Sequence, residues 1–106
     1  MTDNERFTDV ETWIECLDEL IKNVHFLLNI DYKNNYLMPT PEHQKEVRWS
    51  EAWLNAILTA KELIEQNYSP TKIPSMLKDL KIDLDFPAAE EFIEALITED
   101  YEALVD

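Results

Sequence analysis

Few residues in this chain of 106 could perform catalysis or hold a metal ion. There is one cysteine, Cys16, and there are two histidines, His25 and His43. Cys16 and His25 would lie about two and a half turns apart on one helix, too far for the imidazole to activate the thiol. His43 and Glu46 share a helix face, but the Glu-x-x-His pair of bundle di-iron sites is absent. We therefore predict no catalytic residue, no metal site and no cofactor.

The absence of glycine excludes several further kinds of active site. Loops that cradle phosphates, dinucleotide fingerprints and nucleophile elbows all need glycine at positions where the backbone turns sharply or closely approaches a ligand. Tight β-hairpins also favour glycine, because other residues adopt positive φ at a cost. The composition thus argues against an enzyme and against a hairpin-rich β fold.

Charge is the unusual feature of the composition. The chain has 23 acidic and 9 basic residues, a formal net charge of −14. Residues 1–20 carry −6, residues 21–82 carry +1, and the acidic C-terminal segment 83–106 carries −9 with no basic residue. Such a surface can simply keep a protein soluble. It can also attract a basic partner.

The elements that would position these charges are helices. Thr8 and Glu11 have the spacing of a capping box, and Asn29 is a plausible C-terminal stop, which predicts a helix over 9–29 after a flexible acidic N-terminus, 1–7. One face of this helix is apolar. Its residues are Val10, Trp13, Ile14, Leu17, Leu20, Ile21, Val24, Leu27 and Leu28.

Residues 31–38 are expected to form an apolar loop against the core, with Asn34 and Asn35 supplying its turn. Thr40 and Pro41 then have the pattern of an N-cap and first turn, which predicts a helix over 41–66. Apolar residues cover most of the circumference of this helix. A helix of that kind is central in a bundle or takes part in an interface.

Two shorter helices complete the prediction, over 70–81 and 87–104, joined by an extended connector at 82–85. Thr98 is a candidate cap for a last short turn over 99–104. No linker or repeat divides the chain, so 1–106 is expected to be one all-α domain of four main helices. The unequal helix lengths favour irregular or orthogonal packing over a regular bundle. No apolar run is long enough for a membrane span, and the lone cysteine favours the cytoplasm.

The function that these features favour is binding to a basic protein surface, in its sharpest form that of a nucleic-acid-binding protein. Inhibitors such as immunity proteins, antitoxins and anti-CRISPR or other anti-defence proteins are often small and acidic, and rows of carboxylates can act as a nucleic-acid mimic. The outward acidic residues of the first and last helices are the candidate contact residues, with two aromatic anchors. They are Glu15, Asp18, Glu19, Glu90, Glu91 and Glu94, with Trp49 and Tyr101.

The alternative is a structural or adaptor subunit that self-associates, as a homodimer, or joins a larger assembly through the apolar face of the helix 41–66. Direct nucleic-acid binding is not expected. Lys72, Lys78 and Lys81 form a small basic cluster, but phosphate binding needs a sustained basic surface. A net charge of −14 opposes it.

Overall fold

The computed structural model describes the backbone of residues 2–105 and the side chains of residues 10–105. It contains four α-helices and two short 3₁₀ helices, and no strand among the described residues. The predicted all-α fold is confirmed. The elements in chain order are α1 (Thr2–Leu37), α2 (Pro41–Glu65), η1 (Pro70–Lys72), α3 (Ile73–Asp79), α4 (Ala89–Ile97) and η2 (Tyr101–Leu104).

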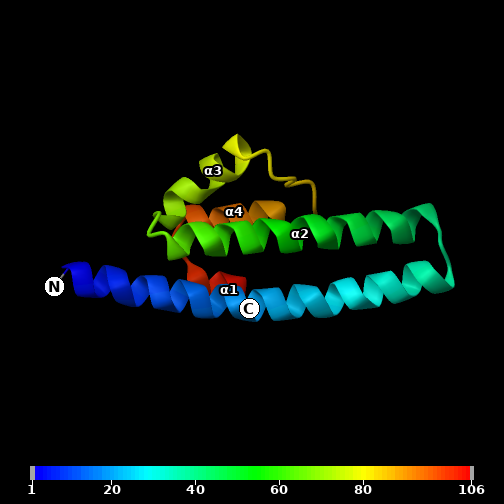
Figure 1. Ribbon diagram of the computed structural model, residues 1–106, viewed down its shortest axis with the longest axis horizontal. Helices are drawn as coiled ribbons and strands as arrows, with labels where there is room; N and C mark the ends of the chain where they lie inside the picture. The colour runs from blue at the N-terminus through cyan, green and yellow to red at the C-terminus, as the bar shows by residue number, and fades with distance from the viewer. Residues whose placement is uncertain (1, 106) are drawn as a thin grey trace.

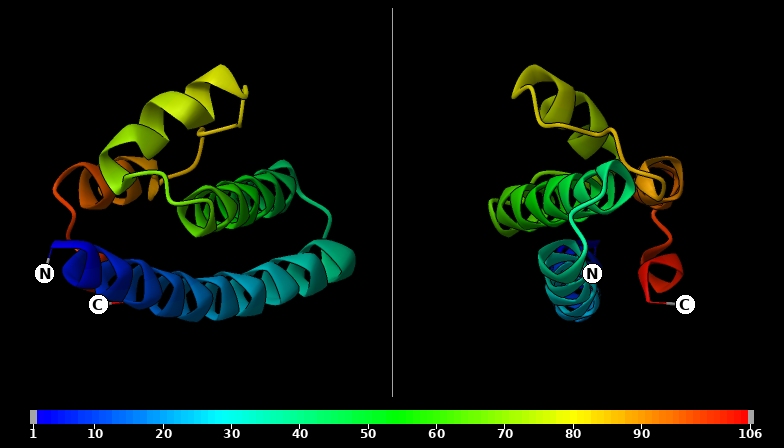
Figure 2. Two further views of the ribbon diagram at one scale, coloured as in Figure 1. Left: turned by 60° about the vertical axis from the view of Figure 1, so that its left-hand side comes forward. Right: turned by 90° about the vertical axis from the view of Figure 1, so that its right-hand side faces the viewer.

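The two long helices form an antiparallel hairpin that runs the length of the molecule (Figure 1). α3 crosses obliquely over the C-terminal half of α2, α4 lies beside that half, and η2 returns to α1 (Figure 2). The molecule measures 55 × 25 × 19 Å. The short helices therefore cover only one end of the hairpin, and the other end projects as two helices alone.

The core lies between the covered part of the hairpin and the short helices. Its fully buried large side chains come from four helices: Leu17 and Val24, Ile57 and Ile64, Ile73 and Leu77, and Leu96. The predicted apolar face of α1 supplies most of its share, but Leu27 is 45% exposed. Burial of each such side chain contributes about 1.5–3 kcal/mol, which makes this cluster the main stabilising contact of the fold.

The first helix is longer than predicted at both ends. Its backbone is helical from Thr2, so it begins before Asp9; the Thr8 side chain of the predicted capping box lies outside the described residues, and so do the side chains of 1–7. The predicted stop at Asn29 is wrong, because residues 30–37 continue the helix. Polar side chains hold this extension to α2, since Asp31 accepts a hydrogen bond from Ser50 at 2.5 Å and Tyr32 donates one to Glu51 at 2.6 Å.

The predicted apolar loop against the core is also wrong. Residues up to Leu37 are helical, and Tyr36, Leu37 and Met38 are 85%, 69% and 62% exposed. The helix ends where Pro39 removes a backbone donor and disfavours helical geometry at Met38. The turn to α2 is thus three residues long, 38–40, and its apolar side chains face solvent.

The second and third helices match their predictions closely. α2 begins at Pro41 after Thr40, whose Oγ1 accepts a hydrogen bond from the His43 backbone at 3.1 Å. The third segment starts as η1 and continues as α3, in which Pro74 occupies the first turn, where its missing N–H is tolerated. The connector 82–85 is neither helix nor strand, and it turns locally, because Asp83 Oδ1 accepts a hydrogen bond from the Asp85 N–H at 2.9 Å.

The predicted last helix, 87–104, is broken in the structure. α4 ends at Ile97, and η2 begins at Tyr101. The break is a Schellman motif: the Asp100 N–H donates to the Ala95 carbonyl at 2.9 Å, and the Glu99 N–H donates to the Leu96 carbonyl at 3.3 Å. Glu99 has φ 56°, a conformation that sequence patterns assign to glycine.

The same motif closes all three of the later α-helices. Asn67 ends α2 with φ 71°, and Lys81 ends α3 with φ 59°. In each case the next residue donates back to the helix, Tyr68 to Leu63 at 3.2 Å and Ile82 to Leu77 at 2.9 Å. Within residues 2–105 this glycine-free chain therefore adopts the left-handed conformation three times. At Lys81 and Glu99 it costs about 1 kcal/mol or more, whereas asparagine, as at Asn67, adopts it more readily.

A substitution at one of these positions tests the capping geometry. Lys81→Gly should raise the free energy of unfolding by about 1 kcal/mol, because glycine adopts positive φ without steric cost. The measurement is the midpoint of thermal or urea unfolding. Lys78→Gly is the matched control, and it should lower stability by about 1 kcal/mol, since that residue lies within α3. A destabilised Lys81→Gly variant would contradict the motif at this position.

Candidate functional site

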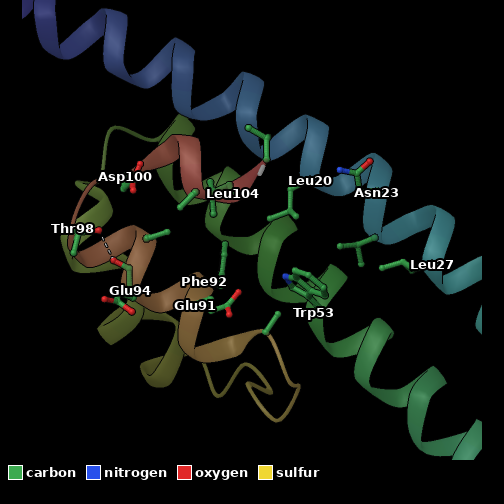
Figure 3. A pocket seen from close by; sticks show the side chains of 15 residues that line it. Leu20, Asn23, Leu27, Trp53, Glu91, Phe92, Glu94, Thr98, Asp100 and Leu104 are labelled. Carbon is green, nitrogen blue, oxygen red and sulfur yellow. Dashed lines mark hydrogen bonds between the residues drawn. The ribbon is translucent and has the colours of Figure 1, made fainter.

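A hollow lies between α1, α2, α4 and the C-terminal segment 98–105 (Figure 3). Its volume is about 450 Å³. Apolar side chains from all of these elements form the floor of this pocket. They are Leu20, Val24 and Leu27 of α1, Trp53 of α2, Phe92 and Ala95 of α4, with Ala88, Ala103, Leu104 and Val105.

The charged residues that line this pocket are all acidic. Glu91 and Glu94 of α4 and Asp100 of the following turn are exposed, and no lysine, arginine or histidine is among the lining residues. The Thr98 hydroxyl donates to the backbone carbonyl of Glu94 at 2.8 Å and fixes this edge (Figure 3). The pocket thus combines an apolar floor with a negative rim.

Trp53 is the aromatic wall of the pocket. Its ring stacks on Phe86 with 5.8 Å between centroids and 14° between planes. Its Nε1–H is buried and has no hydrogen-bond acceptor, and in Figure 3 this nitrogen is turned toward the pocket interior. A buried donor without an acceptor costs about 1–3 kcal/mol, and this nitrogen has almost no accessible surface in the pocket.

A second, smaller hollow of about 180 Å³ continues from the first. Leu27, Trp53 and Ala88 line both, and Trp49 extends the lining toward the N-terminal end of α2. The Trp49 ring is half-buried, with the Lys45 ammonium 4.8 Å from its centroid, a cation–π distance. The predicted anchor Trp49 therefore lies at the end of an apolar groove.

The predicted contact residues of the last helix are only partly brought together. Glu91 and Glu94 line the pocket, whereas Glu90 is exposed but does not line it. Two contributors were not among the predicted contact residues: Trp53 of α2, and Asp100, which falls inside the predicted helix 87–104. The break at Glu99 is what brings Asp100 to the rim.

The predicted acidic residues of α1 lie away from the pocket. Glu15 and Glu19 are exposed and do not line it. Asp18 forms an ion pair with Lys61 of α2 at 2.6 Å, and this contact raises the pKa of the lysine. Asp18 therefore links the two helices of the hairpin, and its side chain is half exposed.

Tyr101, the other predicted anchor, contributes to the core. It packs edge-on against the buried Trp13, with 5.8 Å between ring centroids and 73° between planes. This contact attaches η2 to α1 and so closes one side of the pocket. Tyr101 is therefore a positioning residue for the site.

Cys16, His25 and His43, which the sequence analysis considered for catalysis or metal binding, do not form a cluster. His25 is exposed, and the His43 ring contacts the Met38 carbonyl at 2.6 Å in the turn before α2. Burial raises the pKa of the Cys16 thiol, and the carboxylates of Glu15 and Glu102 raise it further. Among the described residues, no group of three or more potential ligands could hold a metal ion. No described helix is long and apolar enough to cross a membrane.

The effect of Glu102 on Cys16 gives a test of how η2 docks on α1. Glu102→Gln removes a negative charge near the thiol, so the pKa of Cys16 should fall and its alkylation by iodoacetamide at mildly alkaline pH should speed up a few-fold. Glu99→Gln changes the charge equally, and Glu99 is not among the groups that raise this pKa. Equal alkylation rates in the two variants would argue against the docked position of η2.

No family model, curated protein or solved structure matches this chain. The geometry of the site is therefore the basis for any functional inference. That geometry is an apolar groove between α1, α2 and α4, with a rim whose charged residues are acidic at the larger pocket.

Proposed function

We propose that this protein is a non-catalytic, cytoplasmic protein-binding module that holds a basic segment of a partner protein in the pocket between α1 and α4. The observation that carries the proposal is the lining of the pocket. Ten apolar residues enclose its floor, and its three charged residues are all carboxylates. An occupant that satisfies both features has a large apolar side chain with lysine or arginine beside it.

The apolar floor would supply most of the affinity. Complete burial of one large aliphatic or aromatic side chain contributes about 1.5–3 kcal/mol, and a volume of about 450 Å³ has room for more than one such side chain. Well-packed anchors of this kind dominate the binding energy of most interfaces.

The carboxylates would supply selectivity and speed of association. The segment 83–106 carries −9 and the whole chain −14, so a basic partner is attracted from a distance and an acidic one is repelled. Exposed charge pairs of this kind are screened by salt. Binding should therefore weaken as ionic strength rises.

An inhibitor is the form of binding protein that best fits this surface. Basic protein surfaces commonly serve to bind nucleic acid, and carboxylates that cover such a surface would compete with phosphates for it. This is the mode expected for an immunity, antitoxin or anti-defence protein. The target would be recognised by its basic residues next to an exposed apolar side chain.

The test is capture of partners from nuclease-treated lysate of the source cells by three forms of the tagged protein. The first is the unmodified chain, and the second carries Glu91→Lys, Glu94→Lys and Asp100→Lys at the pocket. The third, a control with the same change in charge, carries Glu62→Lys, Glu65→Lys and Asp79→Lys at exposed positions outside both hollows.

A basic protein should bind the unmodified chain and the control and be released at moderate salt. The pocket variant should lose about tenfold or more in affinity, because three charge pairs are replaced by three repulsions. Circular dichroism should show equal helix content in all three forms. Equal capture by the pocket variant and the control, or a partner that resists high salt, would refute the proposal.

A further inference from the structure

The second hollow holds two carboxylates that the larger pocket does not use. Asp31 of α1 and Glu46 of α2 line this hollow, and both are half-buried. Neither forms an ion pair with any residue that the structure describes. The Asp31 carboxylate is held in place, since its Oδ2 accepts the hydrogen bond from Ser50. A charge partly removed from solvent is screened less than an exposed one, so each of these carboxylates attracts a nearby cation more strongly than an exposed carboxylate does.

The other walls of the second hollow are aromatic and aliphatic. They are formed by Trp49, Trp53 and Phe86, with Leu27, Pro87 and Ala88. No lysine, arginine or histidine is among the lining residues. The volume of about 180 Å³ is less than half that of the larger pocket, about 450 Å³. A narrow hollow with apolar walls and two carboxylates suits a side chain that has an apolar stem and a cationic head.

One wall of the hollow already has an ammonium against it. Lys45 Nζ lies 4.8 Å from the centroid of the Trp49 ring. Lys45 is exposed and does not itself line the hollow. Tryptophan attracts cations more strongly than the other aromatic residues do. The ring that forms this wall is therefore placed where a cation reaches its face.

We propose that the second hollow is the subsite for a lysine side chain of the partner segment whose apolar side chain fills the larger pocket, an assignment that rests on the binding function proposed above. The four methylenes of the lysine lie along the apolar walls, and its ammonium contacts Asp31, Glu46 and the Trp49 ring. An ammonium has three donors, so it can contact single oxygens of two carboxylates. A guanidinium is matched best by both oxygens of one carboxylate, and Ser50 already donates to Asp31.

The separation of the two hollows sets the spacing between the lysine and the apolar side chain. Asp31 lies seven residues after Val24 of the larger pocket, and Glu46 lies seven residues before Trp53. Seven residues rise about 10 Å along a helix. Because α1 and α2 are antiparallel, both carboxylates lie at the same end of the groove (Figure 1). An extended segment advances about 3.3 Å per residue, so the lysine lies about three residues from the apolar side chain.

The first experiment tests the second hollow by itself, with n-butylammonium as the probe for a lysine side chain. The full chain, labelled with nitrogen-15, is titrated with this cation and with n-butanol, which has the same stem without the charge. Butylammonium should shift the indole signal of Trp49 and the amide signals of residues 27–31 and 46–50, and it should bind several-fold more tightly than butanol. Equal binding of the two probes, or no shift at Trp49, would overturn the proposal.

Substitution of the two carboxylates tests whether they carry this preference. The double variant Asp31→Asn and Glu46→Gln should lose the preference for butylammonium over butanol, with unchanged circular dichroism. The control Glu19→Gln and Glu62→Gln changes the net charge equally at exposed positions outside both hollows, and it should keep the preference. A preference that survives the Asp31 and Glu46 substitutions would contradict the assignment.

Lys45 gives a test in the opposite direction. Lys45→Ala should raise the affinity for butylammonium a few-fold, since it removes a competing cation from the Trp49 ring. Arg48→Ala removes the same charge from an exposed residue of α2 that does not line the hollow, so its effect should be smaller. Equal effects of the two substitutions would argue against a cation at Trp49.

The last experiment tests the spacing and separates this proposal from the proposed function. Two peptides of equal composition have one phenylalanine and two lysines among serines, with the lysines either three residues from the phenylalanine on both sides or directly beside it. The first peptide should bind several-fold more tightly, and the double variant Asp31→Asn and Glu46→Gln should remove the difference. Equal affinity of the two peptides would overturn the lysine subsite and leave the proposed function standing. Failure of both peptides to bind would instead refute the proposed function, and the subsite with it.

Discussion

The packing of α1 against α2 is the contact on which the rest of the structure depends. Leu17 and Val24 of α1 meet Ile57 and Ile64 of α2 in a core from which solvent is excluded. The short helices have too few residues to be stable by themselves, since isolated helices under about 12 residues are marginal in water. They form because the hairpin offers them an apolar face, and the contact of Tyr101 with Trp13 then holds the end of the chain in place. The walls of the pocket are thus set by the hairpin.

The hairpin also explains why the molecule has two different surfaces. At the covered end, α4 and η2 bring the carboxylates of the most acidic segment around an apolar hollow. At the other end, the helices continue without a third layer, and their polar contacts, such as Asp31 with Ser50, are made between α1 and α2 alone. Apolar side chains at this end of the hairpin, such as Tyr36 and Leu37, are mostly exposed. The covered end is therefore hollowed and lined by carboxylates, whereas the other end exposes apolar side chains.

The sequence predicted the helices where short-range physical signals are strong. Thr40 with Pro41 marked the start of α2 correctly, and the apolar face of α1 identified most of its core residues. The errors have one cause in common, which is that tertiary contacts override local propensity. Asn29 does not end α1, because polar contacts to α2 extend the helix past it. Glu99 and Lys81 adopt positive φ without being glycine. Thr98 indicated a separate last turn, but no residue type marked the left-handed conformation at Glu99 that places Asp100 at the pocket. Glu91 and Glu94 were predicted as contact residues and do line the pocket, but the contribution of Trp53 depended on how far apart α1, α2 and α4 lie.

The central claim, that the pocket between α1 and α4 binds an apolar side chain flanked by basic residues, is tested most directly by nuclear magnetic resonance. The isotopically labelled protein would be titrated with a short peptide that has a phenylalanine between lysines, and with a matched peptide that has glutamates in place of the lysines. The account predicts that the lysine peptide shifts the amide signals of residues 20–27, 53 and 88–105, and that the glutamate peptide does not bind. Shifts spread evenly over all acidic segments, or equal binding of both peptides, would contradict it.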